Sequence, residues 1–400
     1  MVFNFNLYSG LLFPAFLHGI IFAVLLFIRG RREERLSDTL LGWLLLLLSI
    51  KLSFWMLGFA GWFDTHDGYS SFMFYFPFSN VLLIGPLLYF YFLSLTNADF
   101  TFTKAHLRHF ILPGIYLLLV ILKCAVDFIF YYPFAETNQS HFGTKGPWAD
   151  VLNDYIVELI SYASFVYYLF LTLRSYKKYQ AYVVQNFSTT EPISFSWIRN
   201  ILYACAIGIL LFLIFELISL VTDAQGYVFF WYPYMALGLI IYYISIAGYQ
   251  TSNLYRQQLH FEPEAAVTET DTTTPALPPL EIDGSLKPQL QNLMATAKPY
   301  LDPELSLATL SKQMGIQPTV LSKLINDQFK QNFNDFINTY RVNEVINMIK
   351  KGSHHQQTLL GIAFDAGFNS KATFNRAFKK STSLSPKDWI LQFQPANKPE

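Results

Sequence analysis

The chain has 400 residues, enough for two to four domains of ordinary size, but its composition excludes a single soluble body. Hydrophobic residues make up 52% and aromatic residues 18%, whereas charged residues make up 14%, against about 25% in typical globular proteins. The net charge of zero conceals a division along the chain. Residues 1–250 hold 13 basic and 14 acidic residues, residues 251–284 hold 1 and 6, and residues 285–400 hold 14 and 8. A basic C-terminal region therefore follows an acidic linker and a nearly neutral apolar body.

The apolar body contains seven runs long enough to cross a bilayer as helices, which takes about 20 residues each. We place them at Leu7–Ile28, Leu40–Ala60, Phe72–Leu95, Phe110–Phe130, Tyr155–Leu173, Ile198–Val221 and Phe229–Gly248. Residues 1–250 are therefore predicted to form a seven-helix transmembrane bundle, with the two ends of the bundle on opposite sides of the membrane.

Basic residues predict the orientation of this bundle, because short loops rich in lysine and arginine stay in the cytoplasm. The first, third and fifth loops and their flanks carry ten such residues, whereas the second, fourth and sixth loops carry only Lys145. We therefore expect the N-terminus to lie outside and everything after Gly248 to lie in the cytoplasm.

Five charged side chains fall inside the predicted spans, in their outward-facing halves: Lys51, Lys123, Asp127, Glu158 and Glu216. Charged side chains at this depth cost free energy unless they are paired or hydrated, so these five are candidates for a signal-binding pocket that opens to the outside. An alternative stays open. Lys123 and Asp127 are spaced i, i+4 and can form a structural ion pair, and the others can extend toward the membrane surface from helix ends.

Catalytic and metal chemistry find little support in the sequence. No His-Glu-x-x-His stretch occurs, and the two cysteines, Cys124 and Cys205, lie in apolar runs typical of small core residues. His106 and His109 have no third ligand nearby. We therefore expect no enzyme activity, no cofactor and no metal site.

Residues 251–284 are predicted to form a disordered acidic linker. The stretch FEPEAAVTETDTTTPALPP has few large apolar side chains and repeated threonine and proline, so it cannot bury enough surface to offset its ordering entropy.

Two helix-turn-helix patterns fill residues 285–395. The first runs from Leu307 to Phe329, with Gly315 at the turn and Pro318 at the first position of the second helix. A longer helix over Asn332–Lys351 follows, and the pattern then returns over Ile362–Lys380.

These residues resemble the DNA-binding domain of the AraC-type (AraC/XylS) bacterial transcription regulators. The resemblance covers about Ser285–Phe393 and depends on a closing motif at the family's spacing: Ala363, Gly367, Phe368, Ser370, Phe374, Arg376, Phe378, Lys379 and Pro386. Three positions depart from the family: Gln317 replaces the usual capping Ser or Asn, Ser383 replaces a usual glycine, and Gly361 lies inside a helix. The resemblance implies that the second helix of each motif enters the DNA major groove.

Helical periodicity predicts the DNA-reading face independently of that resemblance. If Leu321, Leu324 and Ile325 point inward, one outward stripe remains on the first recognition helix, and burial of Phe374 and Phe378 leaves another on the second. The predicted contacts are Thr319, Ser322, Lys323, Asn326, Lys371, Ala372, Asn375 and Arg376. Lysine and arginine can bind guanine edges, asparagine can bind adenine, and alanine or threonine can contact a thymine methyl.

Together these patterns predict an all-α protein that acts as a one-component transcription regulator in the bacterial cytoplasmic membrane. Its expected partners are double-stranded DNA, membrane lipid, a small-molecule or protein signal of unknown identity, and optionally a second copy of the chain. The alternative, from another class, is a transporter or membrane enzyme whose helical tail regulates it or binds a protein.

Overall fold

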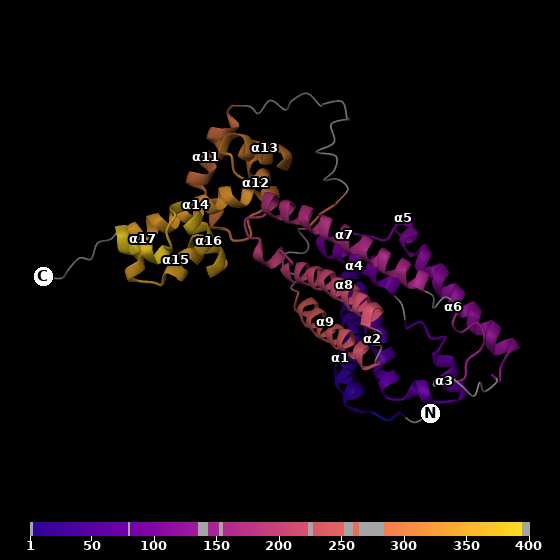
Figure 1. Ribbon diagram of the computed structural model, residues 1–400. Coiled ribbons are helices and arrows are strands. Elements are labelled where there is room, and N and C mark those ends of the chain that lie inside the picture. The colour runs from indigo at the N-terminus through magenta and orange to yellow at the C-terminus, as the bar shows by residue number, and fades with distance from the viewer. Residues whose placement is uncertain are drawn as a thin grey trace. The chain divides into compact units, whose positions relative to one another are not determined.

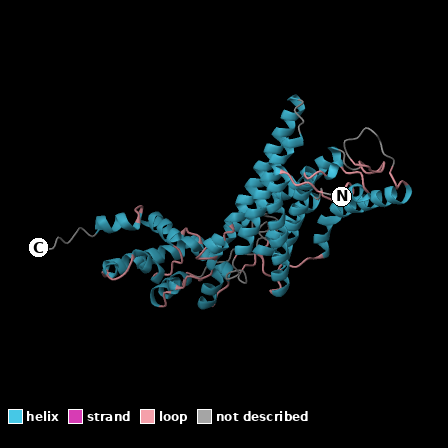
Figure 2. Ribbon diagram, turned by 90° about the horizontal axis from the view of Figure 1, so that it is seen from below, coloured by secondary structure: helices cyan, strands magenta, loops and turns pink. Residues whose placement is uncertain are grey.

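The computed structural model describes residues 3–78, 81–134, 143–151, 155–222, 227–251, 259–263 and 284–393. Within these ranges the elements are helices (Figures 1 and 2), apart from two isolated antiparallel bridges that join Asn97 to His260 and Phe187 to Ser306. The predicted all-α class is confirmed for the described residues.

The chain divides into two compact units, and the division differs from the predicted domain boundaries. One unit comprises Met1–Tyr176 and Ser196–Glu262, and the other comprises Lys177–Phe195 and Pro263–Glu400. A loop that was assigned to the membrane domain by sequence therefore belongs to the same unit as the helix-turn-helix region.

The first unit is organised around α2. Its helices are α1 (Leu7–Arg32), α2 (Leu36–Phe59), α3 (Gly68–Met73), α4 (Val81–Thr96), α5 (Lys104–Leu107), α6 (Ile111–Phe130), α7 (Tyr155–Asn186), α8 (Ser196–Thr222) and α9 (Trp231–Gln250), with α7 passing into the second unit at Lys177. Helix α2 packs against α1, α4 and α9, and its Leu41, Leu45 and Leu52 are fully buried. At the end of α1, Arg29 binds Asp38 of α2 at 2.6 Å and donates to the carbonyl oxygen of Tyr249 in α9.

Four helical segments are long and apolar enough to cross a membrane: Leu7–Arg32, Leu36–Phe59, Lys104–Phe130 and Val228–Gln250. Val81–Thr96 and Ser196–Leu210 are apolar but shorter. The predicted third span, Phe72–Leu95, is broken between α3 and α4, where Pro77 has no N–H to donate to a continuing helix. The count of seven spans is not confirmed.

The expected linker begins with an ordered stretch. Leu259 and Phe261 are buried, and their backbones pair with Ala98 and Thr96 at the end of α4. His260 contacts Asp99 at 2.9 Å. The two large apolar side chains of Leu259 and Phe261 thus find a packing site at the end of α4. Residues 252–258 and 264–283 lie outside the described part of the chain.

The second unit contains two small cores that share one helix. Its helices after residue 284 are α11 (Leu286–Thr296), η6 (Pro299–Leu301), α12 (Leu307–Met314), α13 (Pro318–Phe329), α14 (Phe333–Lys350), α15 (Leu359–Asp365), α16 (Lys371–Thr382) and α17 (Pro386–Phe393). The N-terminal half of α14 contributes Phe333, Phe336 and Ile337 to the first core. Its C-terminal half contributes Val342 and Val345 to the second. Helix α14 therefore joins the two helix-turn-helix motifs through buried side chains.

Caps explain where these short helices begin and end. Ser306, Asn332, Thr358 and Ser370 each accept a hydrogen bond from a backbone N–H in the first turn. Gln317, which stands where the resembled family usually has Ser or Asn, makes no such bond before α13. Ser383 ends α16 with φ +64°, in the left-handed region where glycine is favoured, which explains the glycine usual at that position in the resembled family.

Candidate nucleic-acid interface

The predicted DNA-reading stripe of the first motif lies on α13. Leu321, Leu324 and Ile325 are buried, as their spacing predicted. Of the predicted contacts, Thr319 and Asn326 are exposed, whereas Ser322 and Lys323 are half-buried. The helix therefore presents a polar face whose two ends are open to a partner.

The corresponding stripe on α16 is more open. Lys371, Ala372, Asn375 and Arg376 are exposed, whereas Phe374 and Phe378 pack in the second core. Ser370 caps the helix by accepting a hydrogen bond from the N–H of Thr373 at 3.1 Å. A guanidinium, an ammonium and a carboxamide on one exposed helical face are the groups that bind base edges in the major groove.

A groove of about 490 Å³ lies beside this stripe, along α16 and the starts of α15 and α17. Lys371 and Asn375 line it, together with Lys379 and Lys387. Lys371, Asn375 and Lys379 are spaced i, i+4, i+8, so one side of the helix carries all three. Lys379 and Lys387 were not among the predicted contacts, although this spacing could have identified Lys379. Such ammonium groups suit contacts to DNA phosphates.

A buried arginine fixes the frame that holds the two recognition helices. Arg341 in α14 is 1% exposed, and its guanidinium donates to the carbonyl oxygens of Tyr300 at 2.8 Å and Asp302 at 2.7 Å. Burial lowers the pKa of Arg341 to about 10, so the group still carries its charge at neutral pH. The turn glycine of the second motif, Gly367, has φ +93°, and a Cβ added there would meet the carbonyl oxygens of Tyr300 and Leu301 and the Nε of Arg341. The N-terminal edge of the first motif and the turn of the second thus meet at Arg341.

A second polar contact supports the same frame from α14. The carboxylate of Glu344 accepts from Lys298 at 2.8 Å and from the Tyr300 hydroxyl at 3.1 Å. Burial alone would raise the pKa of Glu344, but the hydrogen bonds from Lys298 and Tyr300 outweigh it and lower the pKa below its ordinary value. Burial, followed by the nearby Glu344 charge, raises the pKa of Tyr300. The three residues tie η6 to α14.

The predicted signal-pocket residues occupy separate environments where the structure describes them. Lys51 lies half-buried on α2, with Nζ 5.8 Å from the centre of the Tyr234 ring. Glu158 is exposed on α7. Glu216 lies in α8, and its side chain falls outside the described residues. Among the described side chains of this set, Lys123 and Asp127 share the buried side of α6.

Lys123 and Asp127 both bind the segment between α6 and α7. Lys123 Nζ donates to the carbonyl oxygens of Ala149 at 2.9 Å and Val151 at 3.1 Å. Asp127 accepts from the Tyr75 hydroxyl at 2.6 Å and from the N–H of Trp148 at 2.9 Å. These contacts satisfy buried polar groups and hold residues 146–151 in place. They favour the structural alternative for this pair.

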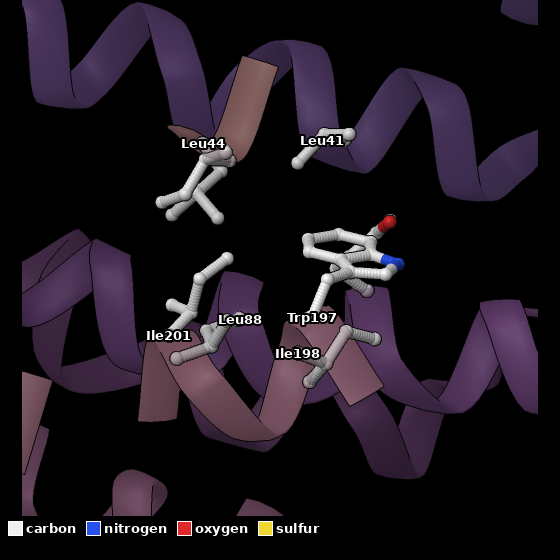
Figure 3. A pocket seen from close by; sticks show the side chains of 8 residues that line it. Leu41, Leu44, Leu88, Trp197, Ile198 and Ile201 are labelled. Carbon is white, nitrogen blue, oxygen red and sulfur yellow. The ribbon is translucent and has the colours of Figure 1, made fainter. Parts of the chain in front are cut away.

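A small apolar void lies elsewhere in the first unit (Figure 3). Leu41, Leu44, Leu88, Trp197, Ile198 and Ile201 are among the side chains that line it. Its volume of about 10 Å³ is no larger than the space for one water molecule. This void therefore offers no room for a signal molecule in the described conformation.

Comparison with known proteins places the C-terminal region in context. Residues 310–392 match a family model described as a helix-turn-helix domain. Over 86 residues the chain is 33% identical to an uncharacterized HTH-type transcriptional regulator of Staphylococcus aureus (strain COL), a match that covers 22% of this chain and 11% of the relative. No solved structure matches the chain. The C-terminal region thus carries an AraC-type helix-turn-helix domain, the part of the molecule that resembles a known transcription regulator.

Proposed function

We propose that the protein is a membrane-embedded, one-component transcription regulator that binds specific DNA sequences through α13 and α16. The observation that carries this proposal is the exposed stripe of Lys371, Asn375 and Arg376 on a capped helix within a matched helix-turn-helix domain. The name of the Staphylococcus aureus relative, an HTH-type transcriptional regulator, supports regulation of transcription rather than catalysis. No step of this function requires a cofactor, a metal or a reaction.

The apolar exterior of the first unit supports placement in the bacterial cytoplasmic membrane. Side chains of α6 that are about half exposed or more include Ile111, Ile115, Leu118, Ile121, Leu122 and Ile129. A continuous apolar surface of this kind is rare on soluble monomers and suits contact with lipid. We infer that the first unit lies in the bilayer, receives an external, lipid or protein signal, and keeps the second unit in the cytoplasm.

The test of DNA binding uses the full chain in lipid nanodiscs and a pool of random DNA duplexes. Repeated selection is expected to enrich a motif with two parts about 10 base pairs apart, because two recognition helices in successive major grooves are separated by one turn of DNA. Failure to enrich any sequence would favour the alternative, a transporter or membrane enzyme with a regulatory tail.

Single substitutions then separate base contacts from general charge. Arg376→Ala and Lys371→Ala are each expected to weaken binding to the selected duplex by about 1–3 kcal/mol and to relax preference at one base position. Lys398→Ala, which removes a charge beyond the last described helix, is the control and should leave the Kd unchanged. Equal losses from all three on random DNA would show that the region binds by charge alone. Sedimentation of the same complex would report whether one or two copies bind.

A further inference from the structure

The loop between α7 and α8 is built into the DNA-binding unit. We call residues 187–191 the brace segment. Phe187 forms an antiparallel bridge with Ser306, which caps α12, and the N–H of Ser188 donates to the carbonyl oxygen of Leu305 at 3.2 Å. Thr189 Oγ1 donates to the carbonyl oxygen of Pro303 at 2.7 Å. These bonds attach the segment to the start of the first helix-turn-helix motif.

Helix α14 binds the same segment through the half-buried side chain of Asn334 and the buried side chain of Arg341. Asn334 Nδ2 donates to the carbonyl oxygen of Ser188 at 2.8 Å, and Arg341 Nη2 donates to the Ser188 hydroxyl at 3.0 Å. Ser188 is fully buried and Phe187 is 5% exposed. The guanidinium that binds Tyr300 and Asp302 therefore has its remaining charge-assisted contact in the brace segment.

The segment also reaches the second recognition helix. Glu191 Oε1 accepts a hydrogen bond of 2.7 Å from the hydroxyl of Thr373 in α16. Thr373 is 3% exposed and lies on the inward side of α16, next to the exposed pair Lys371 and Ala372. One short stretch of chain therefore contacts the start of the first motif, the joining helix and the recognition helix of the second motif.

These contacts leave the DNA-reading stripes open. Thr319 and Asn326 on α13 and Asn375 and Arg376 on α16 remain exposed while the brace segment is bound. A segment that blocked DNA would cover these side chains. The bound arrangement is therefore compatible with DNA contact, and loss of the segment would remove constraints on where α16 lies relative to α13.

We propose that the brace segment is an intramolecular ligand that holds the two recognition helices in their DNA-competent arrangement, so that its displacement lowers DNA affinity. The segment directly continues α7 and leads into α8 after the short turn Glu191–Ile193. Within this turn region the Tyr179 hydroxyl donates to the carbonyl oxygen of Ile193, and Gln180 donates to that of Ser194. Movement of α7 or α8 thus reaches α16 through the brace segment, separately from the linker. The inference rests on the proposed DNA-binding function.

The test measures the Kd of the full chain in nanodiscs for the duplex obtained by selection. Glu191→Ala and Thr373→Val each remove the contact to α16, and each is expected to weaken binding about five- to tenfold, the effect of roughly 1–1.4 kcal/mol. The double variant should be no weaker than either single variant, because both changes remove the same hydrogen bond. Thr373→Ser and Glu191→Gln keep a donor and an acceptor and should retain affinity within about twofold.

Glu304→Ala is the matched control, because it removes an exposed carboxylate from the same unit without touching α16. The proposal would be overturned if Glu191→Ala and Thr373→Val both bound the duplex with the Kd of the wild type. It would also be overturned if Thr373→Ser and Glu191→Gln lost as much affinity as the two disruptive variants. Failure of the wild-type chain to select any duplex would instead refute the proposed function. Proteolysis of each variant in urea, read from the C-terminal end, confirms that the second unit remains folded.

Discussion

Substitution of glycine by alanine is expected to have opposite effects on stability at Gly367 and at Gly361. At Gly367, φ is +93°, and an added Cβ would lie 2.9 Å from the carbonyl oxygen of Leu301 and still closer to that of Tyr300. At Gly361, in the first turn of α15, an added Cβ would meet only side-chain atoms of Gln357 and Thr358 at 3.4 Å, an ordinary contact. Alanine should therefore be harmful at the first position and tolerated at the second.

The expected cost at Gly367 has two parts. Left-handed backbone costs a residue with a side chain about 1–2 kcal/mol. Relief of the overlap must displace the Tyr300 carbonyl that accepts from Arg341 at 2.8 Å, and loss of a hydrogen bond to a charged group costs about 1.5–3 kcal/mol. Gly367→Ala is thus expected to lower the free energy of unfolding of the second unit by about 3–5 kcal/mol. Gly361→Ala should raise it by up to about 1 kcal/mol, because alanine favours the helix.

Pulse proteolysis of the full chain in urea measures both changes when the surviving C-terminal fragment is followed. With a urea dependence of about 1–3 kcal/mol per molar, Gly367→Ala should lower the midpoint by more than about 1 M. Gly361→Ala should leave the midpoint unchanged or raise it. A midpoint for Gly367→Ala within about 0.3 M of wild type, or equal decreases in both variants, would refute the close approach at Arg341.

Three further predictions concern pH, the buried pair and topology. The lowered pKa of Glu344 stabilises the second unit fully at pH values above the ordinary value of 4.5, and this stability is lost as the pH falls through the lowered pKa. The urea midpoint of Glu344→Gln should therefore fall less than that of the wild type between pH 5 and pH 3, and parallel curves for the two proteins would contradict this. Asp127→Ala leaves the Tyr75 hydroxyl and the backbone N–H of Trp148 without their acceptor, so the amount of full-length chain on a blot should fall by more than half. A normal amount of chain with altered promoter output would instead favour a signal pocket. A reporter active only in the cytoplasm should work when fused after Tyr255 and be silent when inserted near Asn138, and the reverse pattern would exclude access of the second unit to DNA.

The short amphipathic helices were the most predictable part of the fold. Leu321, Leu324 and Ile325 recur at helical spacing in a polar background, so the pattern alone separates the buried from the exposed face of α13. The same argument placed Phe374 and Phe378 inside, and all three inward positions of α13 and these two aromatic residues are buried. Local periodicity is enough to predict burial here because each helix has one solvent-exposed face and one buried face.

Apolar segments were harder to predict because their composition is nearly uniform along the chain. Phe72–Leu95 looked like one span, although Pro77 marked the place where the structure separates α3 from α4. Leu259 and Phe261, which are buried, were included in the predicted linker because acidic residues and threonines follow them in the sequence. In both places the average over a window concealed one or two residues that decide the local structure.

The brace segment carried no local signal at all. Ser188 and Thr189 are small polar residues of the kind found in any loop, and their partners lie more than 100 residues away in the sequence. Arg341 gave an indirect sign, since it and Asn338 are polar residues among the mostly apolar buried positions of α14. A buried guanidinium must find several acceptors, but the sequence does not say which segments supply them.

The acceptors of Arg341 explain why distant parts of the second unit respond together. Its donors go to Tyr300 and Asp302 before the first motif and to Ser188 in the brace segment, while Gly367 of the second motif lies close to the Tyr300 carbonyl and to Arg341 Nε. The group stays charged at neutral pH, so loss of any acceptor leaves an incompletely solvated cation in a dry environment, a costly state. Partial release of the brace segment is therefore unfavourable, and the segment is expected to be bound or displaced as a whole. That two-state behaviour is what a regulator needs in order to convert a small movement of α7 or α8 into a change in DNA affinity.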